Sequence, residues 1–307
     1  MAGVLSLAGC NDTGLEFEPA GSSIIQLSFD GLEPLDGGLN YQAWVISLNN
    51  RGYWGAPLGI FNMDGDGGLV DPSSGAPISG DFPANLYPAE VYGVQVSIEL
   101  SDTTVSQPSS TFLLGGPVAG RTGNLSLAHW LGVAVDFEPM EGTFMLMTPS
   151  DDSPENERSG LWFGDNSTGE VLPGLFLPQA PQGWDYEGWV VSGSDTLSTG
   201  KFALPNAADT TDLFGGLSDT PAVPGQDFLF NSPQGISFPL DLAGGSAFLT
   251  LEPWEEWDVA PERPFPIRLM EAQIPQDAAT KVPYVLESRF SEFPTGVVTV
   301  KEPEGSS

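Results

Sequence analysis

Apolar residues in this chain occur in short runs separated by Gly, Pro, Asn and Asp. The run Val91–Leu100 alternates apolar and polar residues with a period of two, which is typical of a half-buried β-strand. No long stretch shows the period of an amphipathic helix. The sequence therefore predicts an all-β protein with tight turns. The other runs expected to form strands are Ile24–Phe29, Ala43–Leu48, Phe112–Leu114, Thr143–Met147, Leu161–Phe163, Trp189–Ser192, Ala247–Leu251 and Val297–Val300.

The same pattern of residues occurs twice along the chain. Residues Leu32, Gly38, Tyr41, Trp44, Val45 and Ser47 recur 145 positions later as Leu177, Gly183, Tyr186, Trp189, Val190 and Ser192. Further matches are Gly59 and Phe61 with Gly200 and Phe202, Asp81-Phe82 with Asp227-Phe228, Glu99, Pro108 and Phe112 with Glu252, Pro261 and Phe265, and Gly142 with Gly296. The spacing changes only across predicted loops and is far too long for a solenoid. We therefore predict two tandem β-sandwich domains that arose by duplication.

The repeat sets the predicted domain boundaries. Residues 1–20 are a lipoprotein signal remnant and tether, 21–149 the first sandwich, 150–301 the second and 302–307 an acidic tail. The polar run Pro149–Ser159 falls at the predicted joint and is either a linker or a long loop.

Each half carries the same ordered set of motifs. The first motif is Tyr-x-x-Trp, at Tyr41–Ile46 in the first half and Tyr186–Val191 in the second. A Gly-x-Phe strand follows, at Gly59–Phe61 and Gly200–Phe202, and the first half alone adds Asp64–Gly67. The last motif is an apolar strand that ends in Glu and precedes a proline, at Val96–Glu99 before Pro108 and at Leu249–Glu252 before Pro261. This order resembles the C-terminal, extracytoplasmic domain of anti-sigma-K factors. The resemblance implies a β-sandwich outside the cytoplasm without known catalysis. In that family a helical cytoplasmic domain holds the sigma factor; no such helical domain is visible in this sequence, so direct sigma-factor binding is not expected.

The sequence near the N-terminus predicts a lipid anchor. Leu7-Ala8-Gly9-Cys10 matches the pattern cut by bacterial lipoprotein signal peptidase, and Cys10 is the single cysteine of the chain. The alternative is a chance match, because the residues before Cys10 are few and include no Lys or Arg. The true start is therefore expected upstream. We predict a lipid-anchored protein of the bacterial cell envelope, outside the cytoplasm.

The charge of the chain excludes some partners. It carries 41 acidic and 9 basic residues, for a net charge of −32. Nucleic acid and anionic membrane surfaces both require basic clusters, so binding to either is not expected. One Cys and one His exclude a Cys/His zinc site and an internal disulfide.

A metal site and a partner site are the two candidate binding features. Asp64, Asp66 and Asp71 could supply oxygens to Ca²⁺, although the spacing fails the EF-hand pattern and a plain loop turn is the alternative. No other cofactor is expected. In the second half, Trp254 and Trp257 alternate with acidic neighbours that include Glu255 and Glu256. They could form an aromatic platform for an envelope protein or glycan, or they could fold over their own sheet.

The residues for catalysis are sparse. His129 is the one histidine, no Gly-x-Ser-x-Gly elbow occurs, and no pair of carboxylates stands out among so many. We therefore predict a non-catalytic binding or sensing protein, in which Trp44 and Trp189 belong to the core. A carbohydrate- or peptide-binding module and a carboxylate-dependent hydrolase are the alternatives. An exposed aromatic cluster would favour the first, and two facing carboxylates in a cleft the second.

Overall fold

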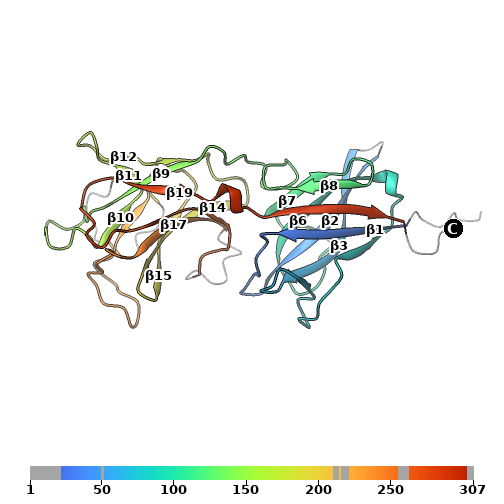
Figure 1. The fold of residues 1–307 in the computed structure, drawn as a ribbon, viewed down its shortest axis with the longest axis horizontal. Helices are drawn as coiled ribbons and strands as arrows, with labels where there is room; N and C mark the ends of the chain where they lie inside the picture. The colour runs from blue at the N-terminus through green and yellow to red at the C-terminus, as the bar shows by residue number, and fades with distance from the viewer. Residues whose placement is uncertain (1–21, 50–51, 210–213, 216–220, 255–262, 303–307) are drawn as a thin grey trace, which may run out of the picture.

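The protein is all-β and consists of two β bodies side by side along its long axis (Figure 1). The computed structural model describes residues 22–49, 52–209, 214–215, 221–254 and 263–302. Two short 3₁₀ helices, η1 (Pro88–Glu90) and η3 (Phe290–Glu292), are the helical elements among these residues. Within the same residues, no helix has the length and apolarity needed to cross a membrane. The predicted all-β class is confirmed.

The first body is a sandwich of two antiparallel sheets. One sheet has the order β4 (Leu69–Val70), β3 (Gly52–Met63), β2 (Leu39–Asn49), β6 (Val91–Leu100), β7 (Phe112–Pro117). The other has the order β5 (Asp81–Ala84), β1 (Ser23–Asp30), β20 (Thr295–Lys301), β8 (Thr122–Leu125). Alternate residues of β1, such as Ile25 and Leu27, are buried between the sheets, as the period-two pattern requires.

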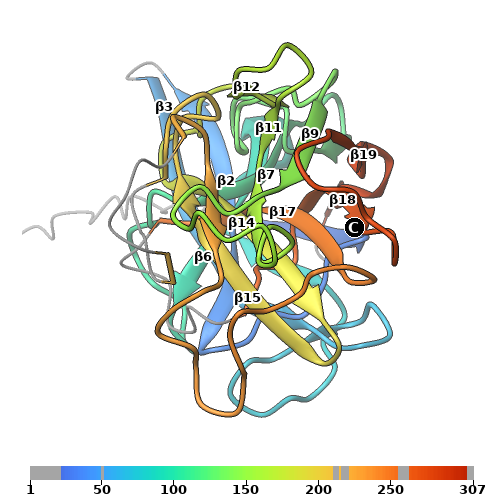
Figure 2. The same cartoon turned by 90° about the vertical axis from the view of Figure 1, so that its left-hand side faces the viewer.

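The second body is a single, strongly bent sheet, seen end-on in Figure 2. Its order is β15 (Asp195–Phe202), β14 (Trp184–Ser192), β17 (Ser246–Pro253), β18 (Arg268–Gln273), β19 (Tyr284–Ser288), β9 (Glu141–Leu146), β10 (Gly160–Trp162), β16 (Gly225–Asp227). Strand β13 (Leu175–Phe176) also pairs with β9, and β11 (Gly164–Asp165) pairs with β12 (Leu172–Pro173). In the first body, by contrast, β7 and β8 are joined only by the Gly115–Ser126 bridge, so the sheet is divided there.

The two bodies exchange strands, which differs from the predicted division at residues 149 and 150. Strand β9 lies in the range 21–149 but pairs with β10, β13 and β19 of the second body. Strand β20 lies in the range 150–301 but runs between β1 and β8 of the first body. The first body is therefore β1–β8 with β20, and the second is β9–β19. The run Pro149–Ser159 is a long loop between β9 and β10, not the joint.

The central strands of the two bodies pair in the same register. Tyr41 pairs with Phe61 and Ile98, and Tyr186 pairs with Phe202 and Leu251. Each first strand pair has a bulge just before its tryptophan, between Ala43 and Trp44 and between Gly188 and Trp189. These pairings reproduce the spacings of 145, 141 and 153 found in the sequence.

The registers of β7 and β18 correct the predicted spacing of the repeat in its last part. Val96 pairs with Leu114, whereas its counterpart Leu249 pairs with Met270, so the spacing has grown to 156 at this strand. The predicted equivalence of Phe112 with Phe265 is therefore wrong, and Pro261, the predicted counterpart of Pro108, lies outside the described residues. The connection after Glu252 is three residues longer than the one after Glu99. Sequence alignment missed the insertion because proline and phenylalanine recur by coincidence at the shorter spacing.

A buried tryptophan is held in each body by the same chain of hydrogen bonds. Trp44 Nε1 donates to Ser97 Oγ at 2.8 Å, and Ser97 Oγ donates to Glu99. In the second body, Trp189 Nε1 donates to Thr250 Oγ1 at 2.9 Å, and Thr250 Oγ1 donates to Glu252. A backbone N–H completes each chain, from Ser109 to Glu99 at 3.0 Å and from Phe265 to Glu252 at 2.8 Å. Both tryptophans are buried, which confirms their predicted place in the core.

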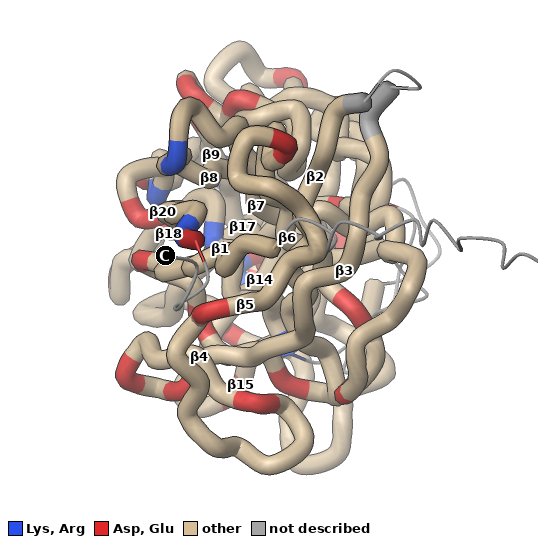
Figure 3. Tube along the Cα trace, turned by 90° about the vertical axis from the view of Figure 1, so that its right-hand side faces the viewer, with Lys and Arg blue, Asp and Glu red and all other residues tan. Residues whose placement is uncertain are grey.

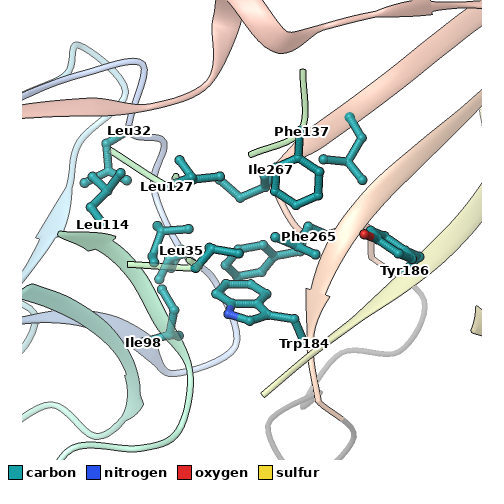
Figure 4. Packing of buried hydrophobic residues seen from close by; sticks show 14 of the residues in the cluster. Leu32, Leu35, Ile98, Leu114, Leu127, Phe137, Trp184, Tyr186, Phe265 and Ile267 are labelled. Atoms are coloured by element: carbon teal, nitrogen blue, oxygen red, sulfur yellow. The ribbon is translucent and has the colours of Figure 1, made fainter. Parts of the chain in front are cut away.

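The two bodies share one continuous apolar core across their junction (Figure 4). Leu35 and Ile98 of the first body face Trp184 and Phe265 of the second. Trp184 Nε1 donates to the Phe112 carbonyl oxygen across the junction at 3.2 Å. Domains usually move against each other unless their interface is large and hydrophobic. Because the core is continuous and the chain crosses the junction twice, we expect the two bodies to behave as one rigid unit.

Candidate ligand-binding cleft

A cleft of about 540 Å³ lies at the junction of the two bodies. Its walls come from three connections: the β1–β2 loop at residues 31–39, the segment 263–268 leading into β18, and the segment 289–294 leading into β20. Glu252 and Pro253 at the end of β17 also line it. Ligand sites occur preferentially at such domain interfaces. This cleft is therefore the main candidate site among the described residues.

Prolines and a few hydrogen bonds shape the walls. The lining prolines are Pro34, Pro253, Pro264, Pro266 and Pro294. Because proline has a fixed φ and no N–H, these segments cannot extend the neighbouring sheets and fill the space. The β1–β2 loop is fixed by Asn62, whose side chain accepts from Leu35 N and donates to the Leu35 carbonyl, both at 3.0 Å.

A buried tyrosine also fixes this loop. Tyr41 Oη donates to the Glu33 carbonyl oxygen at 2.8 Å. Burial raises the pKa of Tyr41 well above its ordinary value, and the charge of Glu33 adds to that shift. The hydroxyl therefore stays protonated as a donor across the physiological pH range. In the second body, Tyr186 Oη makes the corresponding bond to the Pro178 carbonyl oxygen at 3.1 Å.

Three of the nine basic residues of the chain line this cleft. Arg263 Nη1 lies 3.2 Å from Asp36 Oδ2, and the pair joins the two bodies across the cleft. Arg268 Nη1 lies 2.7 Å from Glu271 Oε2, and its guanidinium lies 4.0 Å from the centre of the Phe248 ring. Arg289 pairs with Glu271 at 3.2 Å and with Glu292. The cleft thus gathers a third of the basic residues of the chain, each paired with an acidic side chain.

The arginines differ in how freely they could contact a ligand. The side chains of Arg263 and Asp36 are both more than two-thirds exposed, and an exposed ion pair contributes only about 0–1 kcal/mol to stability. Arg263 can therefore exchange Asp36 for a ligand carboxylate at little cost. Arg268 and Arg289 are less exposed and are tied to Glu271, so they are better suited to shaping the wall. Phe265, Ile267 and Phe293 add apolar surface to the cleft.

One residue of the predicted partner site, Trp254, lies beside this cleft. Trp254 directly follows the lining residue Pro253, and its side chain is 54% exposed. The predicted aromatic platform, which also includes Trp257, stays a prediction. The backbone N–H of Trp254 donates to the Gly183 carbonyl oxygen at 3.0 Å, so its main chain is held in place. Glu255, Glu256 and Trp257 lie outside the described residues.

The predicted calcium ligands do not come together. Asp64 Oδ1 accepts from the backbone N–H groups of Asp66 at 2.9 Å and Gly68 at 2.7 Å, which closes its own turn. Asp71 Oδ1 accepts from Ser74 N and from the hydroxyl groups of Ser73 and Ser74, and these bonds lower the pKa of Asp71. Among the described residues, no three carboxylate, histidine or cysteine side chains form a group that could hold a metal. The loop-turn alternative describes these aspartates.

Two further residues singled out in the sequence are Cys10 and His129. Cys10 falls outside the part of the chain that the structure describes. His129 is half-buried, which lowers its pKa by desolvation, and its Nδ1 accepts from Leu131 N at 3.2 Å. Its ring contacts the ring of Trp130, which also contacts Tyr92; of these three rings only Trp130 is exposed.

The cleft residues were missed in the sequence, although a signal was present. The stretch Arg263–Arg268 reads Arg-Pro-Phe-Pro-Ile-Arg and places two of nine basic residues within six positions. In so acidic a chain, two arginines so close together indicate a candidate binding site. Asp36, which pairs with Arg263, lies more than 200 residues earlier in the sequence, so only the tertiary structure shows that the two meet.

Comparison of the chain with protein-family models, with curated proteins and with solved structures finds no match. The resemblance to the anti-sigma-K C-terminal domain therefore stays a prediction.

Proposed function

We propose that this protein is a non-catalytic binding or sensing lipoprotein of the bacterial envelope, and that it binds its ligand in the cleft between the two bodies. The observation that carries the proposal is the cleft itself, with three arginines of a chain whose net charge is −32. The shared register of the two bodies also supports an origin by duplication, and with it the resemblance to tandem anti-sigma-K-type domains.

The chemistry of the lining favours an envelope glycan or peptide that carries a carboxylate. Arg263 supplies a guanidinium that recognises a carboxylate with two parallel hydrogen bonds. Asp36 and Glu33 line the same wall and can accept from hydroxyl or amide groups. Phe265 and the neighbouring Trp254 offer flat apolar surface for a sugar ring or side chain.

The engagement of the cleft carboxylates supports a binding role over a hydrolase. Glu252 is buried and accepts from Thr250 and from Phe265 N. Asp36 pairs with Arg263, and Glu292 pairs with Arg289. A pair of catalytic carboxylates needs one member held protonated and the other free to act. Glu252 instead has a structural role, and Asp36 and Glu292 are each paired with an arginine.

Replacement of Arg263 tests the ligand site. We expect soluble peptidoglycan fragments, which contain sugars and peptide carboxylates, to bind the full chain, and Arg263→Gln to weaken binding at least about tenfold, because a charge-assisted hydrogen bond is lost. Isothermal titration calorimetry measures this. The control is Arg158→Gln, which breaks another surface ion pair, with Asp241 in the second body, away from the cleft. Equal affinities for the three proteins, or no saturable binding, would contradict the assignment.

Lipid attachment is tested separately. When the full gene is expressed in a bacterium fed with a fatty-acid analogue, we expect labelling of the protein and its recovery with membranes. Cys10→Ser should remove both, because no other thiol is present to accept the lipid. Unchanged labelling and membrane recovery in the variant would show that the protein has no anchor at this residue.

A further inference from the structure

Both described ends of the chain emerge at one end of the molecule. Ile24 at the start of β1 pairs with Lys301 at the end of β20, far from the junction with the second body (Figure 1). The β2–β3 hairpin, η1 and the β7–β8 connection reach the same end, as the registers of β2, β6 and β8 require. We call this end the terminal pole, and it consists of residues 22–25, 46–49, 52–55, 84–93, 115–123 and 299–302. Figure 3 looks onto it.

Large apolar side chains stand out at the terminal pole. Leu48 is 52% exposed, Tyr87 49% and Trp54 40%. Trp54 also lines a groove of about 400 Å³ between β3 and β5, next to Ser22 and Leu86. Trp130 is exposed beside the pole, where its ring centre lies 6.5 Å from that of Tyr92. Leu48 and Trp54 belong to the β2–β3 hairpin, and Tyr87 directly precedes η1. The exposed apolar side chains are therefore spread over the pole.

The terminal pole is nearly neutral, in contrast to the rest of the chain. Its described acidic residues are Glu90 and Glu302, and its described basic residues are Arg121 and Lys301. Arg121 Nη2 lies 2.5 Å from Glu302 Oε1, so that pair is neutralised locally. Most of the acidic residues that the structure describes therefore lie outside the terminal pole.

We propose that the terminal pole docks on the lipid–water interface of the membrane that holds the Cys10 anchor, with Trp54 and Tyr87 at the depth of the headgroups. This inference rests on the proposed lipid anchor. Trp and Tyr are enriched at membrane interfaces because an apolar ring and a polar group suit that boundary. A surface carrying negative lipids would repel the acidic remainder of the protein and leave this pole as the side that approaches.

The length of chain between Cys10 and Ser23 explains why docking would matter for the orientation of the protein. These twelve residues can reach about 40 Å when extended, so the tether alone would leave the protein free to rotate. Docking of the pole removes that freedom and directs the second body away from the membrane. The cleft between the bodies is then held at a constant distance from the lipid, facing the space in which an envelope ligand is found.

The test uses the lipidated full chain in phosphatidylcholine vesicles that contain a lipid with a nitroxide quencher at the headgroup. One protein carries a fluorophore on the thiol of Ala89→Cys at the exposed face of η1, and the matched control carries it on Ser232→Cys, which is equally exposed on the second body. Docking predicts at least threefold stronger quenching at position 89 than at position 232. Adding Trp54→Ser and Tyr87→Ser should remove that difference while flotation with vesicles and the melting temperature stay unchanged, because both side chains are on the surface.

Several results would overturn the proposal. If the protein floats with the vesicles but quenching is equal at the two positions, the protein is anchored and the pole does not dock. A difference that survives Trp54→Ser with Tyr87→Ser assigns the orientation to other residues. A doubled mass in solution that the same two substitutions abolish identifies a second copy of the chain as the occupant of the pole. Failure to float at all, in contrast, contradicts the lipid anchor of the proposed function and is distinguished from these results by the flotation assay.

Discussion

A chain that ends after Pro294 is expected to lose the cooperative folding of its first body. The missing strand β20 is an inner strand, paired with β1 on one side and β8 on the other. It buries Val298 and Val300 completely in the core of the first body. Burial of two such side chains contributes about 3–6 kcal/mol, and the loss of both ladders adds to this. That sum approaches the roughly 5–15 kcal/mol by which a whole domain is stable.

Circular dichroism and thermal melting measure this loss, and two substitutions in β20 refine it. Val298→Asp places an unpaired charge in the core, so it should be as damaging as the truncation. Val297→Asp is the matched control, because Val297 is the neighbouring residue of the same strand and faces solvent. The control should cost less than about 1 kcal/mol. A truncated chain with an unchanged melt would show that the first body closes without β20.

The strand exchange also changes what an isolated half can do. Residues 21–149 alone should not fold, since they lack β20 and carry β9 without its partners. Joining 22–139 to 294–302 through a short Gly-Ser linker should restore a cooperative melt. The linker can be short because the rings of Phe137 and Phe293, at the two crossings of the junction, lie 5.7 Å apart. A cooperative melt of 21–149 by itself would contradict the exchange.

Trp189→Ala is expected to destabilise the protein by about 3–5 kcal/mol. Trp189 is completely buried, stacks against Phe248 with ring centres 6.3 Å apart, and donates to Thr250. The substitution leaves a large cavity and removes the donor from the chain of hydrogen bonds that ends at the buried Glu252. Chemical denaturation followed by circular dichroism gives the free energy of unfolding for each variant.

Two further variants act as controls for Trp189. Trp44→Ala should cost a similar amount, because Trp44 makes the same contacts with Ser97 and Glu99 in the first body. Trp254→Ala should cost less than about 1 kcal/mol, since that ring is exposed. If Trp189→Ala lowered the free energy of unfolding no more than Trp254→Ala does, the assignment of Trp189 to a hydrogen-bonded core would be wrong.

Much of the local architecture follows from the sequence. The period-two pattern of Val91–Leu100 predicts a strand with one buried face, and the structure has β6 at those residues. The repeated Tyr-x-x-Trp motif predicts two equivalent core strands, and β2 and β14 have matching partners. These features depend on residues close together in the chain, for which periodicity is a direct physical signal.

The assignment of strands to bodies could not be predicted in this way. Gly142 and Gly296 mark equivalent strands, so β9 and β20 suit either body almost equally well from their residues. Their places depend on how the two connections cross the junction. The insertion before β18 could not be predicted for a related reason. The spacing between equivalent residues of the two bodies is established there by the hydrogen bond from Phe265 N to Glu252 and by the pairing of β17 with β18, and not by residue identity.

By itself, the sequence determined that this protein is all-β, that it carries one strand pattern twice, and that Trp44 and Trp189 lie in its core. Each of these depends on the alternation of apolar residues within a strand, which is a local property. The tertiary structure alone decided the exchange of β9 and β20 and the cleft that it creates at the junction. Asp36 lies more than 200 residues before Arg263 and Arg289 in the sequence, and only the closure of both bodies around a common core brings it to the same cleft.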